Sequence, residues 1–245
     1  WCAPGNAGIA EIAECLSLDA NDPQAVVGEC RDLDIDLLVI GPEAPLEAGV
    51  SDAARDAGVK VFGPSQAASM LETSKTFTKE ICDASGAPTA RYASFDDADA
   101  AKTYISDQGA PIVIKADGLA AGKGVVVAQT DAEALDAVDR MMDGPGGGTV
   151  LIEEMMVGEE ASYFVLTDGT TILPLVGAQD HKRAYDGDEG PNTGGMGAYS
   201  PAPAFTPELE SRALSEIVQP ILDEMRARGT PYSGVLYVGL MLTGE

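Results

Sequence analysis

The amino-acid sequence predicts a protein of the α/β class, for three reasons. Two short apolar runs, at 35–41 (IDLLVIG) and 59–62 (VKVF), flank a stretch with apolar residues at helical spacing, which is the pattern of a β-α-β unit with a right-handed crossover. From residue 111 onward, short β runs surround one predicted helix. A long amphipathic helix from Thr206 and a strand over 235–242 follow. We therefore expect a parallel α/β beginning and a smaller α+β part behind it.

The first part of the chain predicts an open α/β domain. The run at 35–41 is almost continuously apolar and ends at a Gly-Pro pair, as expected for a parallel strand that is buried on both faces. The apolar residues from Leu46 to Ala57 recur at helical spacing, and Gly58 ends that helix. We expect residues 1–68 to be the remnant of an open α/β domain whose first strand precedes this segment.

The next part is expected to be helical. Ser65 is a suitable N-cap for a helix that carries Met70, Phe77 and Ile81 on one face. A further helix is predicted over 96–106.

The middle of the chain alternates short strands with a single helix. The strands are predicted at 111–115, 124–128, 149–153, 161–166 and 171–176. The helix between them begins with a capping box formed by Thr130 and Glu133. Together these elements predict a small α+β lobe over 111–176.

The last part combines an irregular segment with a helix and a strand. Residues 177–206 show no apolar period and are rich in Gly, Asp and Pro, which indicates a functional or disordered loop. Pro207 suits the first turn of the helix that follows, and Pro220 is expected to kink its middle.

The composition excludes several classes of protein. The 245 residues include 40 Asp and Glu against 15 Lys and Arg, which gives a formal net charge of −25. Such a surface repels phosphate backbones and anionic lipids, so neither nucleic acid nor a membrane is an expected partner. We expect a cytoplasmic protein. The excess of acid also suggests adaptation to concentrated salt, where screening weakens the self-repulsion of the chain.

Cysteine and histidine are too sparse for the common sites built from them. The four cysteines form no C-x-x-C pair, and His181 is the single histidine. This pattern argues against a zinc site, a disulfide framework and a poly-His metal site. A serine triad is not expected, because no G-x-S-x-G sequence is present. By itself, His181 is more often a packing residue than a general base.

A Gly-rich segment from Lys115 to Gly124 (KADGLAAGKG) is the strongest local signal for binding. It lies between two predicted strands, and its glycines would let backbone N–H groups approach an anion. The spacing is neither that of a Walker A loop nor G-x-G-x-x-G. The alternative interpretation is an ordinary flexible hairpin.

The placement of the lysines favours binding over the plain hairpin. Four of the seven lysines lie in segments that other features single out, namely Lys75, Lys115, Lys123 and Lys182. In a chain so poor in cations this indicates a site for a polyanion. The alternative for Lys75 is a solvated helix face that it shares with Lys79, one turn further on.

Two further segments carry functional groups. Glu153 and Glu154 end one predicted strand and Glu159 and Glu160 begin the next, so they are either solvated turn carboxylates or acceptors for the amino group and hydroxyls of a nucleoside. The segment 179–201 joins QDHKR to a Gly-rich run, which is typical of a binding loop.

A series of short runs resembles the phosphoribosylamine–glycine ligase family of the ATP-grasp superfamily. In chain order these runs are APGNAG, GPEAPL, FGP, SKTFTK, PIVIKADGLAAGKGV, IEE, GEEAS, QDHKR and GPNTGGMGAYSP. The resemblance extends over essentially the whole chain. QDHKR followed by GPNTGGMGAYSP is specific to this family, whereas the Gly-rich loop and IEE indicate only the superfamily.

The resemblance implies an ATP-grasp fold behind a partial Rossmann-like domain. It implies the division 1–68 for the N-terminal domain, 69–110 and 177–245 for the A subdomain, and 111–176 for the B subdomain. It also implies an enzyme of purine biosynthesis that joins glycine to 5-phosphoribosylamine with ATP. Glycine would first form glycyl phosphate, from which the amine displaces phosphate. Such chemistry depends on positioning and charge neutralisation more than on a dedicated base.

The family's functional residues match positions in this chain. The expected ATP-binding residues are Lys75, Lys115, Gly118, Gly122, Lys123, Gly124, Glu153, Glu154, Met155, Met156, Glu160, Arg183 and Asn192. Within this set, the loop at 118–124 is expected to close over the phosphates, 153–156 to hold adenine, and Glu160 to hold the ribose. Lys123, Arg183 and Asn192 are the expected catalytic residues. Glycine or the amine is expected to be held by Asp180, Thr193, Gly194, Gly195 and Met196.

The family's Mg²⁺ or Mn²⁺ ligands are expected beyond Glu245, so no metal ligand is predicted within this chain. Two alternatives remain open at this point. One is another ATP-grasp ligase that joins a carboxylate to an amine, and the other is a nucleotide-binding module without activity.

Overall fold

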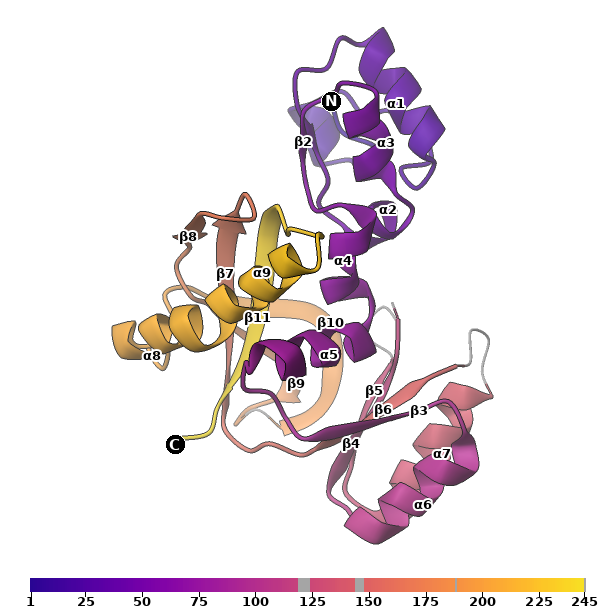
Figure 1. Cartoon of the computed structure of the whole chain (residues 1–245), viewed down its shortest axis with the longest axis vertical. Coiled ribbons are helices and arrows are strands. Elements are labelled where there is room, and N and C mark those ends of the chain that lie inside the picture. The colour runs from indigo at the N-terminus through magenta and orange to yellow at the C-terminus, as the bar shows by residue number, and fades with distance from the viewer. Residues whose placement is uncertain (119–123, 144–147, 188, 245) are drawn as a thin grey trace.

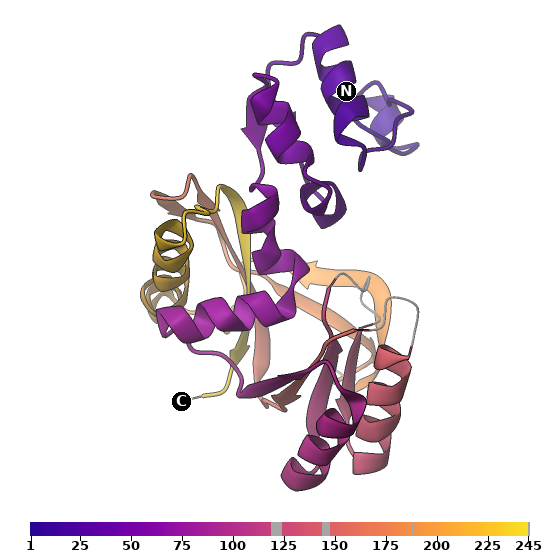
Figure 2. The same cartoon turned by 45° about the vertical axis from the view of Figure 1, so that its right-hand side comes forward.

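The computed structural model describes residues 1–118, 124–143, 148–187 and 189–244. Within these ranges the backbone alone is described for Lys182, Arg183, Glu189, Pro191, Asn192 and 194–196. The molecule is elongated, with an N-terminal region at one end and a four-stranded lobe at the other (Figure 1). A three-stranded sheet with its helices lies between them, and α4 and α5 connect the N-terminal region to the rest (Figure 2).

The N-terminal region contains the predicted β-α-β unit. Its elements are η1 (Ile9–Glu11), α1 (Pro23–Asp32), β1 (Leu38–Val39), α2 (Glu43–Glu47), α3 (Val50–Asp56) and β2 (Val61–Phe62). β1 and β2 pair in parallel, with Leu38 opposite Val61. The small core consists of Val26, Cys30 and Val50, against which Leu38 and its neighbours pack.

The expectation of a strand buried on both faces at 35–41 is wrong. Leu38 and Ile40 face the helices, but Leu37 and Val39 point the other way and are exposed. In a strand, successive side chains alternate between the two faces of the sheet. Among the described residues, helices cover only one face here, so half of this apolar run faces solvent.

The helix predicted after Ser65 is two helices, α4 (Gln66–Thr73) and α5 (Lys75–Ser85). Ser65 caps α4 as expected, because its hydroxyl accepts from the Ala68 N–H at 3.1 Å. Ser74 has extended backbone angles and caps α5 in the same way, through the Phe77 N–H at 3.1 Å. The break changes the direction of the chain, so Met70 does not share the buried face of Ile81 and is 40% exposed.

The lobe is a four-stranded antiparallel sheet with two helices on one face (Figure 1). Its elements are β3 (Tyr92–Phe95), α6 (Ala98–Gln108), β4 (Ile112–Ala116), β5 (Val125–Ala128), α7 (Asp131–Met142) and β6 (Val150–Glu154). The strand order is β3-β6-β4-β5. Ile114, Val138 and Ile152 form the centre of its core and are fully buried. Thr130 caps α7 through the Glu133 N–H, as the capping box predicts.

The second sheet has the order β11-β7-β8. It consists of β7 (Glu159–Thr167), β8 (Ile172–Pro174) and β11 (Gly234–Leu242). The sequence placed β7 and β8 in the same lobe as β4 to β6, but β7 pairs with β11, and β8 pairs with β7. Conversely, β3 precedes residue 111, where the predicted lobe begins, but it pairs with β6 and so belongs to the sheet of the lobe. The apolar alternation in a strand specifies its buried face but not its partner strand, and the division into domains stays a prediction.

The helices behind this sheet begin where predicted. They are α8 (Pro207–Arg212), a π-helical segment η2 (Ala213–Val218) and α9 (Gln219–Ala227). Pro220 lacks a backbone N–H and cannot make the regular helical hydrogen bond. The kink expected at Pro220 takes the form of the π-helical segment just before it, and the helix continues through both. Leu222 and Met225 pack with Ile81 and Tyr163 in the largest core cluster. None of the helices in the described ranges is long and apolar enough to cross a membrane.

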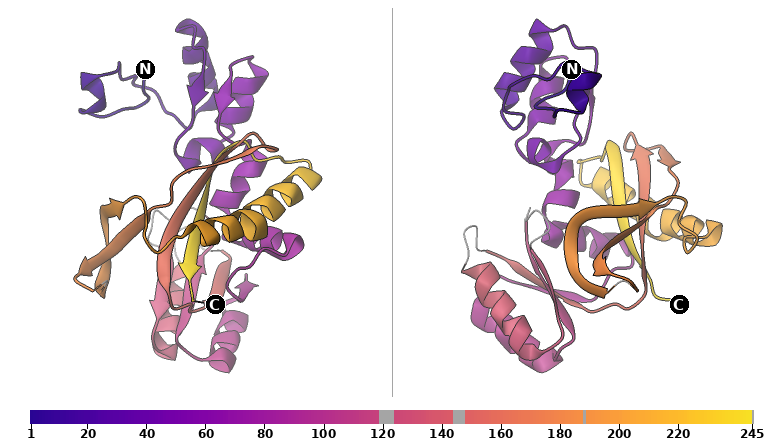
Figure 3. Two further views of the ribbon diagram at one scale, coloured as in Figure 1. Left: turned by 90° about the vertical axis from the view of Figure 1, so that its left-hand side faces the viewer. Right: turned by 180° about the vertical axis from the view of Figure 1, so that it is seen from behind.

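The expectation of an irregular segment at 177–206 is wrong for most of its length. β9 (Gln179–Tyr185) and β10 (Glu189–Tyr199) pair as an antiparallel hairpin that projects from the three-stranded sheet (Figure 3). The register shifts on either side of Asn192. Gly-rich strands with bulges have no side-chain period to detect, because the pairing is made by the backbone.

Candidate functional site

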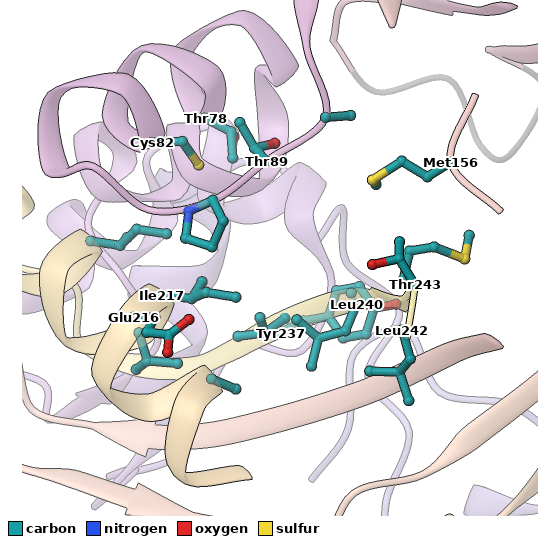
Figure 4. A pocket seen from close by; sticks show the side chains of 18 of the residues that line it. Thr78, Cys82, Thr89, Met156, Glu216, Ile217, Tyr237, Leu240, Leu242 and Thr243 are labelled. Atoms are coloured by element: carbon teal, nitrogen blue, oxygen red, sulfur yellow. The ribbon is translucent and has the colours of Figure 1, made fainter. Parts of the chain in front are cut away.

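A cavity of about 960 Å³ lies between α5, the η2–α9 helix and β11 (Figure 4). Among the described strands, β11 pairs with β7 alone, and the cavity follows its other edge. One part of the lining is apolar and includes Cys82, Ile217 and Leu240. Charged residues also line the cavity, and among them are Lys75, Lys79, Lys115 and Glu153. These include residues that the sequence singled out.

The pleat of the lobe's sheet places Glu153 and Lys115 on one face. Ile114 and Ile152 face α6 and α7, so the residues next to them along each strand face the other way. Glu153 lies opposite Val113 on β4 and therefore shares a face with Lys115. The Lys115 Nζ is 2.6 Å from Glu153 Oε2. The sheet itself thus brings this pair together.

Helix α5 adds a second lysine to the same carboxylate. The Lys79 Nζ is 3.1 Å from Glu153 Oε1, and both side chains are buried. Lys79 also donates to Thr89 Oγ1 at 2.7 Å and to the Ala90 carbonyl at 3.0 Å. A buried carboxylate is stable as an ion only when it is paired and hydrogen-bonded, and Glu153 meets that condition on both oxygens.

The start of α5 is held by Asp117, which comes from the Gly-rich segment. Asp117 Oδ1 accepts from the backbone N–H groups of Lys75 at 2.6 Å and Thr76 at 3.2 Å, and Ser74 Oγ donates to Oδ2 at 3.2 Å. The Lys75 Nζ in turn donates to the Gly118 carbonyl at 2.8 Å. A carboxylate at a helix N-terminus is stabilised by these N–H groups and by the helix dipole.

These contacts shift the pKa values of both charged groups. Burial lowers the pKa of Lys75, and the nearby Lys115 adds to that effect, although Asp117 and Glu153 act in the opposite direction. Burial acts to raise the pKa of Asp117, but hydrogen bonds from backbone N–H groups outweigh it and hold that pKa below its usual value. Asp117 therefore stays ionised while it caps the helix.

Glu154, the neighbour of Glu153, faces a different partner. Its carboxylate accepts from the Arg91 backbone N–H at 2.8 Å and from Arg91 Nε at 2.7 Å. These hydrogen bonds, the backbone one first, lower the pKa of Glu154. The side chain of Glu154 thus joins β6 to the segment before β3, whereas the sequence placed Glu154 among the ATP-binding residues.

The structure brings together only part of the predicted site. Lys75, Lys115, Gly118 and Glu153 converge, and Met156 lines the same cavity (Figure 4). Other predicted residues have backbone or side-chain contacts away from this cluster. Gly124 accepts from the Ala116 N–H, and the Met155 sulfur accepts from Gln129, at 2.8 and 3.7 Å. The predicted Gly122 and Lys123 lie outside the described residues.

A second group of predicted residues lies on the β9–β10 hairpin. Arg183 and Asn192, both expected near the γ-phosphate, are directly opposite each other in the register. Asp180 is paired with Ala198, and 193–196 belong to β10. Among the described residues, Asp180 Oδ1 is shielded from solvent and has no hydrogen-bond partner. His181 is exposed and stacks on Tyr199, with ring centroids 5.5 Å apart.

Glu160, the predicted ribose ligand, is the second residue of β7 and lies opposite Met241. The cavity lining includes the adjacent Glu159 and Met241 itself. Glu160 thus belongs to a strand that reaches the cavity, and its role stays a prediction.

Sequence analysis missed two residues of this site. Lys79 was named only in the alternative interpretation of Lys75, as part of a solvated helix face, but it is 6% exposed. Its spacing of three residues from Cys82, which is buried on the same helix, was the available signal. Asp117 lay within the Gly-rich segment but was not singled out, because its partners are some 40 residues earlier in the chain.

A metal centre does not form from the side chains in the described ranges. No group of three or more His, Cys, Asp or Glu residues there is arranged to hold a metal ion. The donors near the lysines, Glu153 and Asp117, are both engaged with cations or N–H groups. The described residues therefore do not fit a metal ion, and the ligands implied beyond Glu245 stay a prediction.

Two family descriptions together match the whole chain. Residues 1–72 match "Phosphoribosylglycinamide synthetase, N domain", and residues 73–245 match "Phosphoribosylglycinamide synthetase, ATP-grasp (A) domain". The ATP-grasp fold and the α/β class expected from the sequence are thereby confirmed.

Similar proteins carry a related name. The phosphoribosylamine–glycine ligases of Brucella melitensis and Agrobacterium fabrum are 54% and 55% identical over 248 residues, and each match covers 100% of this chain. The crystal structure of phosphoribosylamine–glycine ligase from Thermotoga maritima superposes with a TM-score of 0.82 at 30% identity and covers 98% of this chain. The matches cover 58% and 59% of the two relatives and 58% of the Thermotoga protein. The chain belongs to the phosphoribosylglycinamide synthetase family.

Proposed function

We propose that the protein to which this chain belongs ligates glycine to 5-phosphoribosylamine with ATP, giving glycinamide ribonucleotide, ADP and phosphate. The observation that supports this best is the pairing of Lys79 and Lys115 with one buried carboxylate, Glu153, beside the Gly-rich segment, with Lys75 lining the same cavity. In a chain with a net charge of −25, such a group of ammonium ions is a site for a polyanion. The names of relatives at 54–55% identity support this choice of reaction.

The proposed reaction has two steps. A carboxylate oxygen of glycine attacks the γ-phosphorus of ATP, the bond to the β-phosphate oxygen breaks, and ADP leaves. The amine nitrogen of phosphoribosylamine then attacks the carbonyl carbon of glycyl phosphate, phosphate leaves, and the nitrogen loses a proton. Both steps join two anionic or polar reactants, so orientation and charge neutralisation are the main contributions of the protein.

The residues of this chain have distinct proposed roles. Lys75 and Lys115 bind the phosphates, and the segment 118–124 closes over them. The segment 153–156 holds adenine, and Glu160 accepts from the ribose hydroxyls. Arg183 and Asn192 act at the γ-phosphate, and their opposite positions on the hairpin support a shared role.

The proposed site for glycine or the amine is the other part of the hairpin. Asp180 has one buried oxygen with no partner among the described residues, so it suits a ligand N–H group. Residues 193–196 follow on the paired strand. A cytoplasmic location and the use of Mg²⁺ or Mn²⁺ belong to the same proposal.

The direct test measures ADP release by the full-length protein to which this chain belongs. We expect release to require ATP, glycine and phosphoribosylamine together. Release with a different amine but not with phosphoribosylamine would indicate another ATP-grasp ligase. ATP binding without release under any of these conditions would indicate a nucleotide-binding module.

A contrast between two lysines tests the roles within the site. Lys115 is held by the sheet and Glu153, so Lys115→Ala is expected to weaken ATP binding directly. Lys123 lies in the Gly-rich segment and is proposed to meet charge that develops during transfer, so Lys123→Ala is expected to lower kcat more than ATP affinity. Steady-state kinetics and ATP titration of both variants decide between them. An unchanged kcat for Lys123→Ala would contradict its catalytic role.

A further inference from the structure

We propose that Lys79 is a positioning residue for phosphate binding: it fixes the Glu153 carboxylate so that the Lys115 ammonium keeps donors and charge for the phosphates. This inference rests on the proposed function, because it assumes that Lys115 binds a phosphate. It assigns a role to a buried ion that the reaction itself does not use.

The contacts of Lys79 leave it nothing to offer a ligand. A lysine ammonium has three N–H donors. Thr89 Oγ1 and the Ala90 carbonyl accept from it at 2.7 and 3.0 Å, and Glu153 Oε1 forms an ion pair with it at 3.1 Å. The ring of Tyr92 covers it further, with its centroid 5.1 Å from Nζ. Because its ammonium is surrounded by these protein partners and its side chain is buried, Lys79 acts through them.

Lys115 differs from Lys79 in these respects. Among the described residues its ion-pair partner is Glu153 alone, so two of its donors remain for a ligand. Its side chain is 29% exposed, compared with 8% for that of Lys79. Both lysines line the cavity, but only Lys115 has donors to present to a ligand there.

The charges of the three groups explain why Lys79 is needed. Lys79 and Lys115 together outweigh the single charge of Glu153, so the group keeps one net positive charge. Without Lys79, Glu153 and Lys115 would neutralise each other, and Glu153 Oε1 would be a buried acceptor without its cation. Phosphate binding would then lose charge and geometry together, although no ligand contact had been removed.

The test is a double-mutant cycle between Lys79 and Glu153, read by calorimetric titration with ATP and with adenosine. We expect Lys79→Met to weaken ATP binding about tenfold, the order of effect of removing one partner of a buried ion pair. In the Glu153→Gln background the same substitution is expected to change ATP affinity by less than about twofold, because the group through which it acts is gone. Adenosine affinity is expected to change little in either background.

Lys102→Met is the matched control. Lys102 also forms an ion pair, with Asp139 at 2.5 Å, but it joins α6 to α7 away from the cavity. Its removal takes one positive charge from the chain, so it reports the general effect of charge on ATP binding.

Each result supports or overturns the inference. If Lys79→Met weakens ATP binding equally in both backgrounds, Lys79 acts as a ligand or a general charge and the inference is wrong. If Lys79→Met does not fold, the double variant Lys79→Met with Glu153→Gln still tests the inference, because it leaves no unpaired carboxylate buried. A large loss relative to Glu153→Gln alone then overturns the inference. If the unaltered protein binds adenosine and ATP equally, the proposed function itself fails.

Discussion

Residues 1–62 and residues 92–154 begin from similar sequences and reach different degrees of burial. IDLLVIG in the first and PIVIK in the second are both short apolar runs. In the lobe, Ile112 and Ile114 are buried within a cluster of ten residues. In the N-terminal region, the strand at 38–39 has two residues, its core cluster has three, and Val39 is 60% exposed.

The difference lies in the number of neighbours that each run finds. β4 lies between β6 and β5 and is covered by α6 and α7. β1 has one partner strand among the described residues, and helices cover it on one side. Apolar burial contributes roughly 25 cal/mol per Å² removed from water. An equally apolar run therefore stabilises the fold less where fewer layers cover it. Hydrophobicity of a run thus predicts a strand, but not its contribution to stability.

The largest expected effect is a direct test of this comparison. Ile114→Ala is expected to cost about 2–5 kcal/mol of unfolding free energy, because it leaves a cavity at a fully buried position. Val39→Ala is its counterpart on the other run and is expected to change stability by no more than about 0.5 kcal/mol. Urea unfolding followed by circular dichroism measures both. Equal losses would mean that the N-terminal strand is covered in solution.

A second, smaller effect is expected where the N-terminal region meets the rest. Burial, and then repulsion from Glu43 of α2, raise the pKa of Glu72 on α4 to about 7, although a hydrogen bond from the Tyr237 backbone opposes them. A raised pKa in the folded state means that this carboxyl favours folding at low pH and loses that contribution as pH rises through 7. The same burial and the charges of Glu72 and Glu43 raise the pKa of Tyr232.

Glu72→Gln is therefore expected to stabilise the protein at pH 8 by about 1–3 kcal/mol and to have little effect near pH 5. Thermal unfolding from pH 5 to 8 measures the difference between variant and parent. A constant difference across this range would show that Glu72 ionises normally. Glu47→Gln, in the same helix as Glu43, serves as a control because it removes a charge of the same sign nearby.

The smallest effect concerns salt. Residues 1–62 contain twelve acidic and three basic residues around their three-residue core, so repulsion weighs most heavily there. Raising KCl from about 0.1 to 1 M shortens the screening length from about 10 to 3 Å. We expect a gain of about 1 kcal/mol in unfolding free energy. Hydrogen exchange should show more slowing in 1–62 than in 92–154, and equal slowing in both would contradict the comparison.

The candidate site divides in the same way between what sequence predicts and what it cannot. Lys75, Lys115 and Glu153 were predicted as binding residues, and the structure brings them together. They could be predicted because Gly-rich turns and strand ends, which are typical of binding sites, lie next to them in the sequence. Lys79 and Asp117 were missed, because each acquires its role from partners that lie far away in the chain. A lysine on a helix is usually solvated, and only packing over it reverses that expectation.

The sequence by itself determined the order of the main helices and strands, the caps at Ser65 and Thr130, and the family. Those features depend on neighbours within a few residues or on long matching runs. Only the tertiary structure decided which strands pair, that 179–199 form a hairpin, and that one buried carboxylate joins two lysines. Strand pairing and burial are properties of distant segments in contact, and a local pattern of hydrophobicity or charge does not contain them.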